Sequence, residues 1–212
     1  MDIMKNLKKN FKIFVMATLT VILLGNCTKD SGDYSAELAP KPFNGNTYQY
    51  LKANVGFDSL LLVIDRLNLT DTLIHNSITL FAPTNESFVR VVTKYNVARK
   101  LQNRVPLYLK DMDRDFLDSI MCRYIIRGLY PANSFNFING LTISAVRYGY
   151  PMNAKLSTAN ASGFKSGGPA VIDLSYTRRS SFSIDWSKTT ANTVDLRTSN
   201  GIRIRTEFVL TA

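Results

Sequence analysis

The chain has 212 residues, 45% of them apolar and 20% charged, and this composition excludes low-complexity, fibrous and intrinsically disordered proteins. The formal net charge is +10, of which the first 26 residues contribute +3 through four lysines and one aspartate. The remaining +7 favours acidic partners such as anionic glycans or phosphate groups. The basic residues between Arg90 and Arg127 lack interleaved aromatic stacking motifs, so we expect no nucleic-acid partner.

The first 26 residues have the pattern of an export signal. The basic segment MDIMKNLKKNFK precedes an apolar run, residues 13–25, that is shorter than the ~20 residues a spanning helix needs. The run ends in LLGNC, which resembles the lipobox of bacterial lipoproteins, although Asn26 replaces the usual small residue. The resemblance implies a signal peptide over residues 1–26 and lipidation of Cys27, which would anchor the chain to a membrane. The alternative is ordinary secretion with Cys27 as a free thiol.

Residues 27–42 are polar, contain Gly and Pro, and lack apolar periodicity, so they predict a flexible tether. Thr28 after the lipidated cysteine resembles the pattern for sorting to the outer membrane of Gram-negative bacteria. The following KDSGD is similar to, but weaker than, a surface-export signal. We therefore expect a lipid-anchored outer-membrane protein that faces outward, with the periplasmic face as the alternative.

The folded part, residues 43–212, opens with helical patterns. In FDSLLLVIDRLNL the apolar residues recur at helical spacing and predict an amphipathic helix. SITLF then predicts a strand that Pro83 stops, because proline has no amide proton for a ladder. Thr84 is expected to cap a new helix, with Glu86 in its first turn and Phe88 on its buried face.

Further along, KYNVARKLQN and DMDRDFLDSIMC predict two more helices, the second capped by Asp111 or Asp113. Asn139-Gly140 stands between apolar segments and predicts a β-hairpin. From there LTISAVRYGY, MNAKLS, AVIDLSY, SFSIDW, TVDLRT and IRIRTEFVL predict short strands. The predicted fold class is α+β, with a helical N-terminal half and a β-rich C-terminal half.

Two stretches resemble conserved blocks of the fasciclin domain family. TLFAPTNESF resembles its first block, a strand-to-helix corner, and TSNGIRIRTEFVL resembles its second, with a turn before the last strand. The matching residues are Phe81, Ala82, Pro83, Thr84, Asn85 and Phe88 in the first block, and Asn200 and Gly201 in the second. The resemblance spans residues 43–212 and implies a β-sandwich or wedge flanked by several helices. Such domains occur in extracellular adhesion and matrix proteins and in bacterial lipoproteins near glycan-uptake systems.

The sequence departs from the family at two places tied to receptor contacts. Arg123-Tyr124 stands where many members have Tyr-His, and Ile204 stands where the second block usually has a histidine. We therefore do not carry over an integrin-type function.

No catalytic or metal-binding motif is predicted. The single histidine, His75, lies in a polar turn, and no nucleophile, zinc or phosphate-binding motif accompanies it. The run DMDRDFLD imitates a calcium loop, but Phe116 replaces the required glycine and Cys122 the bidentate glutamate. We expect no enzyme activity, no cofactor and no metal.

Aromatic side chains are candidates for stacking on a sugar ring. Tyr148, Tyr150 and Trp186 lie in the β-rich half, and Tyr124 lies where the sequence departs from the Tyr-His motif of the family. Their alternative role is core packing or cross-strand pairing. Three Asp-Ser/Thr pairs resemble the O-glycan acceptor pattern of some exported bacterial proteins, with Ser59, Thr72 and Ser119 as acceptors, although helix-start chemistry explains them equally well.

The sequence predicts a non-enzymatic, lipid-anchored cell-surface adhesion or binding module. Its partner would be a glycan or a protein of a surface complex. The alternative is a structural accessory subunit of an outer-membrane transporter or envelope complex that makes protein contacts alone.

Overall fold

The computed structural model describes residues 41–160, 163, 165 and 168–206. The predicted signal peptide, the lipidation site Cys27 and most of the predicted tether lie outside the described residues, as do residues 207–212. The described elements belong to one compact unit, Ala39–Ala212. Among its helices, none has the length and apolar character that crossing a membrane would require.

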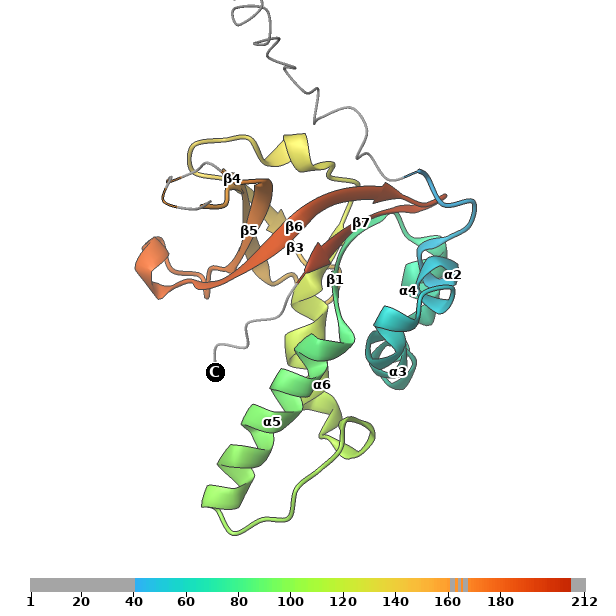
Figure 1. Cartoon of the computed structure of the whole chain (residues 1–212), viewed down its shortest axis with the longest axis vertical. Coiled ribbons are helices and arrows are strands. Elements are labelled where there is room, and N and C mark those ends of the chain that lie inside the picture. The colour runs from blue at the N-terminus through green and yellow to red at the C-terminus, as the bar shows by residue number, and fades with distance from the viewer. Residues whose placement is uncertain (1–40, 161–162, 164, 166–167, 207–212) are drawn as a thin grey trace, which may run out of the picture. The chain divides into compact units, whose positions relative to one another are not determined.

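The chain is helical first and β-rich afterwards, which confirms the α+β prediction (Figure 1). The α-helices are α2 (Thr47–Lys52), α3 (Asp58–Arg66), α4 (Thr70–His75), α5 (Asn85–Leu101) and α6 (Arg114–Met121). The strands are β1 (Ile78–Pro83), β2 (Ile125–Arg127), β3 (Leu141–Ser144), β4 (Pro151–Thr158), β5 (Ala170–Tyr176), β6 (Ser187–Arg197) and β7 (Gly201–Thr206). Short 3₁₀ turns are η1 (Val55–Phe57), η2 (Leu109–Asp111), η3 (Cys122–Tyr124), η4 (Ala132–Phe135) and η5 (Ser183–Asp185).

The seven strands form one sheet in the order β2-β1-β7-β6-β5-β4-β3. All neighbours are antiparallel except β1 and β7, which run parallel and pair Ile78 with Gly201. The sheet curls so that its two outer strands meet: Ile126 bridges Ala145, and the Val146 amide donates to the Ile125 carbonyl at 2.8 Å. This contact covers the edges, where free backbone groups would otherwise invite pairing with another chain.

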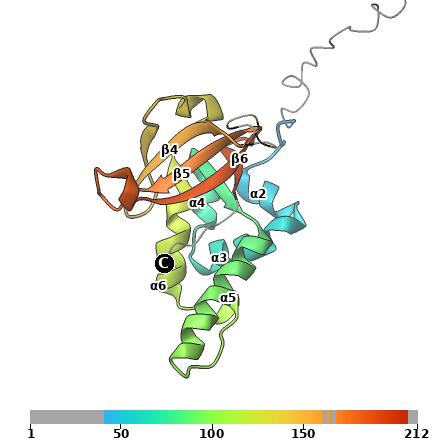
Figure 2. The same ribbon diagram turned by 60° about the vertical axis from the view of Figure 1, so that its left-hand side comes forward.

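The helices pack around the β1–β7 side of the sheet, and α5 extends away from it (Figures 1 and 2). The core combines Leu60 and Ile64 of α3, Phe81 of β1, Phe88 of α5 and Leu117 of α6. All five side chains are buried, as the helical spacing of the α3 and α6 segments predicts. Each contributes ~1.5–3 kcal/mol through burial.

The strand-to-helix corner has the predicted arrangement, with one difference at the cap. β1 is buried along its length and ends at Pro83, and Thr84 occupies the N-cap of α5. The Thr84 side chain makes no capping hydrogen bond, which corrects the prediction. Its carbonyl instead accepts from the Ser87 amide at 3.0 Å, and its hydroxyl lies 3.4 Å from Ser87 Oγ in the buried interior.

Two asparagines of the family blocks join elements distant in sequence. Asn85 Oδ1 accepts from the Ser59 amide at 2.9 Å, and its Nδ2 donates to the Val55 carbonyl at 2.8 Å. Asn200 Nδ2 lies within 3.1 Å of the carbonyls of Leu73, Ile74 and Asn76, while its Oδ1 accepts from the Thr47 amide at 3.0 Å. Asn200 thereby fixes the ends of α2 and α4 at the start of β7.

Gly201 follows at a point with no room for a side chain. A Cβ added there would collide with Thr47 Oγ1. The Thr198 amide donates to the Gly201 carbonyl at 2.9 Å, which closes the predicted turn before β7.

The predicted hairpin at Asn139-Gly140 is wrong. The segment before it is η4 and a turn in which the Gly140 amide donates to the Phe137 carbonyl at 3.0 Å. Fully buried Phe135 packs on Phe81 with ring centroids 6.4 Å apart, and this anchorage leaves no strand to pair with β3. The partner of β3 is β4, and the turn that joins them contains Tyr148 and Gly149, both at positive φ.

Two further segments differ from their predictions. SFSIDW contains η5 instead of a strand, because the Asp185 amide donates to the Phe182 carbonyl and the Ser180 hydroxyl to Asp185 Oδ2 at 2.6 Å. KYNVARKLQN is not a separate helix but the second half of the 17-residue α5. For α6, Asp113 is the cap, since its Oδ1 accepts from the Phe116 amide at 2.8 Å.

Candidate functional site

One face of the β4–β5–β6 ribbon carries a polar floor. Side chains alternate between the two faces of a strand, so residues two apart share a face. On this face the cross-strand register places Asn153 beside Ser175 and Ser175 beside Lys188, and in the next row Lys155 beside Asp173. The opposite face of the same strands supplies core residues: Met152, Ala154, Ile172, Leu174 and Ala191.

Two loops form walls around this floor. One is the turn before β3, from which Asn139 accepts a hydrogen bond from Asn153 Nδ2 at 3.1 Å. The other is the loop between β5 and β6, which includes η5 and ends at Trp186. The Trp186 indole Nε1 donates to the Ser180 carbonyl at 2.9 Å, and this bond fixes the ring at the rim.

The floor and walls enclose an open cavity of about 620 Å³, here called the β4–β6 pocket. Its lining residues are Ile138, Asn139, Asn153, Lys155, Asp173, Ser175, Ser181, Ser183, Trp186 and Lys188. Although they lie on the outer face of the sheet, Asn153 and Ser175 are each only 6% exposed because the loops cover them. The cavity is large enough for a small ligand, and most of its lining residues are polar or charged.

Asp173 organises the charge of the pocket. Its Oδ2 accepts from Lys188 Nζ at 2.7 Å and from Ser157 Oγ at 2.9 Å, and its Oδ1 accepts from Thr190 Oγ1 at 3.1 Å. Lys155, directly opposite on β4, adds a second ammonium group to the lining. One carboxylate and two ammonium groups therefore give the pocket a positive balance.

Of the four aromatic candidates, only Trp186 lies in this pocket. The other polar residues of the pocket were not predicted from the sequence as site residues: Asn153, Lys155, Asp173, Ser175 and Lys188. The polar positions in MNAKLS and AVIDLSY alternate with apolar ones, which shows a solvent-facing side of each strand. That signal cannot reveal which strands are neighbours or which loops cover them.

Tyr148 and Tyr150 lie together at the turn between β3 and β4. Their ring centroids are 5.7 Å apart, and Tyr150 contacts Tyr176 edge to face at 5.5 Å. Arg123 stacks over Tyr176 at 4.2 Å from the ring centroid and over Tyr150 at 5.3 Å. Tyr148 is 62% exposed and open to contact, whereas Tyr150 is committed to the stack, which fits the pairing alternative.

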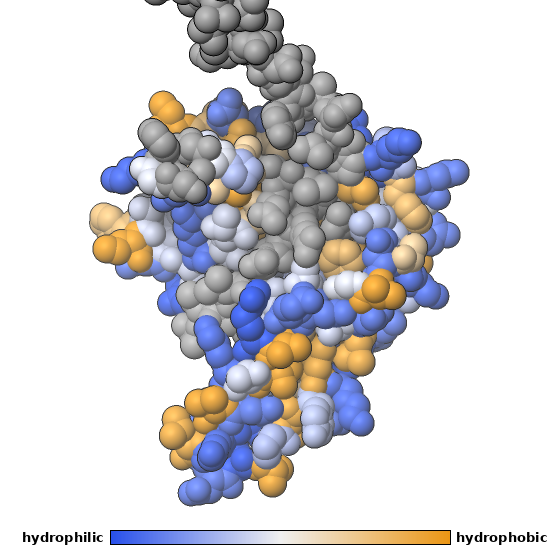
Figure 3. Space-filling model, in the orientation of Figure 1, coloured by the Kyte–Doolittle hydropathy of each residue, from blue (hydrophilic) through white to orange (hydrophobic). Residues whose placement is uncertain are grey.

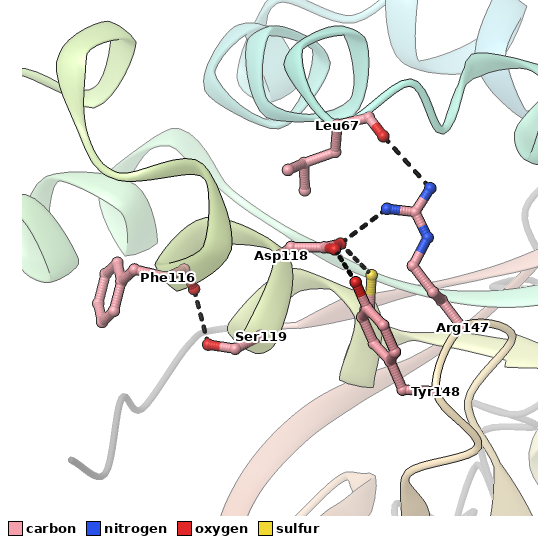
Figure 4. A network of polar contacts seen from close by, with 7 residues as sticks. Leu67, Phe116, Asp118, Ser119, Arg147 and Tyr148 are labelled. Atoms are coloured by element: carbon pink, nitrogen blue, oxygen red, sulfur yellow. Dashed lines mark hydrogen bonds and ion pairs between the residues drawn. The ribbon is translucent and has the colours of Figure 1, made fainter.

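A buried carboxylate holds this turn against α6 (Figure 4). Asp118 accepts from Arg147 Nη1 at 3.0 Å, from Cys122 Sγ at 2.7 Å and from the Tyr148 hydroxyl, while Arg147 Nη2 donates to the Leu67 carbonyl at 3.3 Å. Burial alone would raise the pKa of Asp118, but the hydrogen bonds from Cys122 and Tyr148 and the charge of Arg147 outweigh it and lower that pKa. Burial and the bond to Asp118 raise the pKa of Cys122 to about 12, so this thiol stays protonated and unreactive.

The prediction that Tyr124 contacts a ligand is wrong. The side chain is only 8% exposed, and burial raises the pKa of its hydroxyl. A ring enclosed in the core cannot present a face to a sugar. Tyr124 therefore has a packing role.

The three candidate acceptors for O-glycans are all half-buried. The Ser59 amide is bonded to Asn85, Thr72 lies inside α4, and the Ser119 hydroxyl donates to the Phe116 carbonyl at 2.8 Å. Use of these sites stays a prediction. Histidine 75 is exposed at the end of α4, and within residues 41–160 and 168–206 no three His, Cys, Asp or Glu side chains gather as metal ligands would.

Comparison with known proteins agrees with the fold. Residues 55–202 match the family described as Fasciclin domain. Among solved structures, the chain is similar to a FAS1 domain pair from the insect cell adhesion molecule Fasciclin I, with a TM-score of 0.55 and 15% identity. The match covers 81% of this chain and 52% of that one, so this chain spans about half the length of the domain pair. No curated protein matches the sequence.

The matched region contains the first block at the β1–α5 corner, Asn200 of the second block, and every strand except most of β7. The corner and Asn200 have the structural roles that the resemblance implies. The chain belongs to the fasciclin domain family.

Proposed function

We propose that this protein is a lipid-anchored cell-surface adhesion module that binds a carbohydrate in the β4–β6 pocket. The observation that carries the proposal is the combination of Trp186 at the rim with a floor of Asn153, Asp173, Ser175 and Lys188. An indole offers an apolar face to the C–H side of a pyranose. Amide, carboxylate, hydroxyl and ammonium groups pair with sugar hydroxyls, which each donate and accept.

The charge of the pocket favours an acidic sugar. Lys188 is already paired with Asp173, whereas Lys155 stands across the floor on the neighbouring strand. A uronic acid or a sulfated sugar would place its anionic group near these ammonium groups. Adhesion by a fasciclin-type fold has a precedent in the insect cell adhesion molecule whose structure this chain resembles.

The pocket provides its own reporter, because Trp186 is the single tryptophan of the chain. Titration with uronic-acid oligosaccharides should change the intrinsic fluorescence in a saturable way, and neutral oligosaccharides of equal length should bind more weakly. Trp186→Ala, followed by calorimetry, should weaken binding about tenfold, which corresponds to ~1.4 kcal/mol. Tyr108→Ala is the matched control, since Tyr108 is an exposed aromatic residue outside the pocket. Equal affinity of both variants would contradict the assignment of the pocket.

The structural accessory role is the competing outcome. If no glycan binds and one membrane protein co-purifies with the intact chain from native membranes, that role replaces carbohydrate binding.

The anchor is tested separately. Cys27→Ala should move the protein from the membrane fraction to the soluble fraction, because a mature chain without lipid loses its apolar anchor. Fractionation in high salt removes electrostatic adsorption. Retention of Cys27→Ala in the washed membranes would show that lipidation at this residue does not hold the protein there.

A further inference from the structure

The end of α5 and the turn that follows it combine exposed aliphatic side chains with cations. Val97, Leu101 and Val105 are exposed, and Leu101 is 82% exposed. Lys100 and Arg104 are exposed beside them. These five residues, here called the α5 tip, lie at the far end of a helix that projects from the body of the domain (Figures 1 and 2).

The segment that carries the α5 tip is basic in sequence. Residues 87–110 include six basic residues and no acidic residue: Arg90, Lys94, Arg99, Lys100, Arg104 and Lys110. In the space-filling view, hydrophobic and strongly hydrophilic side chains are intermixed over this lower projection (Figure 3). This segment is therefore basic and carries aliphatic groups among its cations, and acidic residues resume at Asp111 and Asp113.

The α5 tip is held by specific contacts. Asn96 accepts from the Leu107 amide at 2.9 Å and donates to the Leu107 carbonyl at 2.8 Å, so the returning chain is fastened to the helix. Arg99 Nε donates to the Val105 carbonyl at 2.7 Å, and the Arg104 amide donates to the Arg99 carbonyl at 2.9 Å. Asn103 adopts a positive φ of 54°, which turns the chain sharply. The exposed side chains are thus presented by an ordered turn and do not depend on a partner for their position.

We propose that the α5 tip docks on an anionic lipid bilayer, with Val97, Leu101 and Val105 between the headgroups and Lys100 and Arg104 on the lipid phosphates. A projecting end can enter the headgroup layer without burying the polar surface around it. Aliphatic side chains within a basic field are the composition of interfacial membrane segments. Protein interfaces, in contrast, are depleted in lysine and enriched in aromatic residues, methionine and arginine, and of these the α5 tip contains only Arg104.

The test uses the full chain bound to vesicles. It measures the environment of the α5 tip itself, so membrane attachment through the N-terminus does not give the same signal. Leu101→Trp adds a reporter at the tip, and Val55→Trp adds one at another exposed aliphatic position, 84% exposed in η1. Vesicles of phosphatidylcholine with phosphatidylglycerol should shift the Leu101→Trp emission to the blue, and brominated lipid should quench it. Val55→Trp should show neither effect, and both variants carry the same Trp186 background.

The charge is tested in the same reporter. Lys100→Glu with Arg104→Glu should remove the quenching, because each cation near an anionic surface adds about fivefold to the partition coefficient. Lys165→Glu with Arg179→Glu is the matched control, since both residues are exposed in the β-rich half. The proposal is overturned if Leu101→Trp is not quenched, or is quenched equally in pure phosphatidylcholine. It is also overturned if its emission shifts without lipid as protein concentration rises, which would identify a second copy as the occupant.

Discussion

The β1–α5 corner and the β4–β6 pocket are both rich in polar side chains, and they differ in what those side chains face. At the corner and at the start of β7, Asn85 and Asn200 are engaged by backbone groups of other elements. In the pocket, Lys155, Ser181 and Ser183 line open space. The residues by which the family is recognised therefore build the domain, whereas the proposed binding pocket lies on a face that carries no motif.

The largest expected effect is at Asn200. Asn200→Ala should lower the free energy of unfolding by about 3 kcal/mol, because it leaves backbone groups of α2 and α4 without their partner in a half-buried position. Urea unfolding measures this loss. Carbohydrate binding by the folded fraction should be unchanged.

Asn133→Ala is the matched control, since Asn133 is an exposed asparagine of η4. It should change the unfolding free energy by no more than ~0.5 kcal/mol. If both variants lost the same unfolding free energy, Asn200 would stabilise the domain no more than an exposed asparagine does.

Asp118 lies outside both the β1–α5 corner and the β4–β6 pocket. Its substitution measures how much a buried, fully hydrogen-bonded carboxylate stabilises the domain. Asp118→Asn should cost about 2 kcal/mol at neutral pH, because the charge-assisted hydrogen bonds from Arg147, Cys122 and Tyr148 weaken.

The pH dependence of this loss has a definite sign. The folded-state pKa of Asp118 is lowered, so its contribution is full above the unfolded-state pKa of about 3.9 and is lost as the pH falls through the folded-state value. Urea unfolding of wild type and Asp118→Asn should therefore differ most above about pH 5. If the difference in unfolding free energy between wild type and Asp118→Asn grew as the pH fell, the pKa of Asp118 would not be lowered in the folded state.

The smallest stability effect is expected in the pocket. Lys188→Ala removes the ion pair with Asp173, but the Lys188 side chain is 58% exposed, so the unfolding free energy should change by less than ~0.5 kcal/mol. Affinity for acidic oligosaccharides should nevertheless fall, as calorimetry can measure. A large loss of stability with no change in affinity would place Lys188 with the structural residues of the corner.

Sequence patterns over a few residues predicted the helices and strands that depend on neighbouring residues alone. The helical spacing from Phe57 to Leu67 and the passage from β1 into α5 depend on periodicity and on Pro83, and both are present. The prediction at Asn139-Gly140 failed because core packing of a neighbouring residue decided it, and the prediction at SFSIDW failed because hydrogen bonds within the loop close a turn there. Phe135 is anchored in the core, and Ser180 with Asp185 closes a 3₁₀ turn.

Short-range spacing and turn chemistry were enough to predict the order of helices and strands, the family and the structural role of its two blocks. The burial of Tyr124, the parallel pairing of β1 with β7, and the cavity that Asn153, Asp173 and Lys188 share with Trp186 became visible only in the folded chain. Strand register accounts for the difference. Alternation along one strand tells which side chains share a face, but hydrogen bonding between β4, β5 and β6 sets which of them become neighbours.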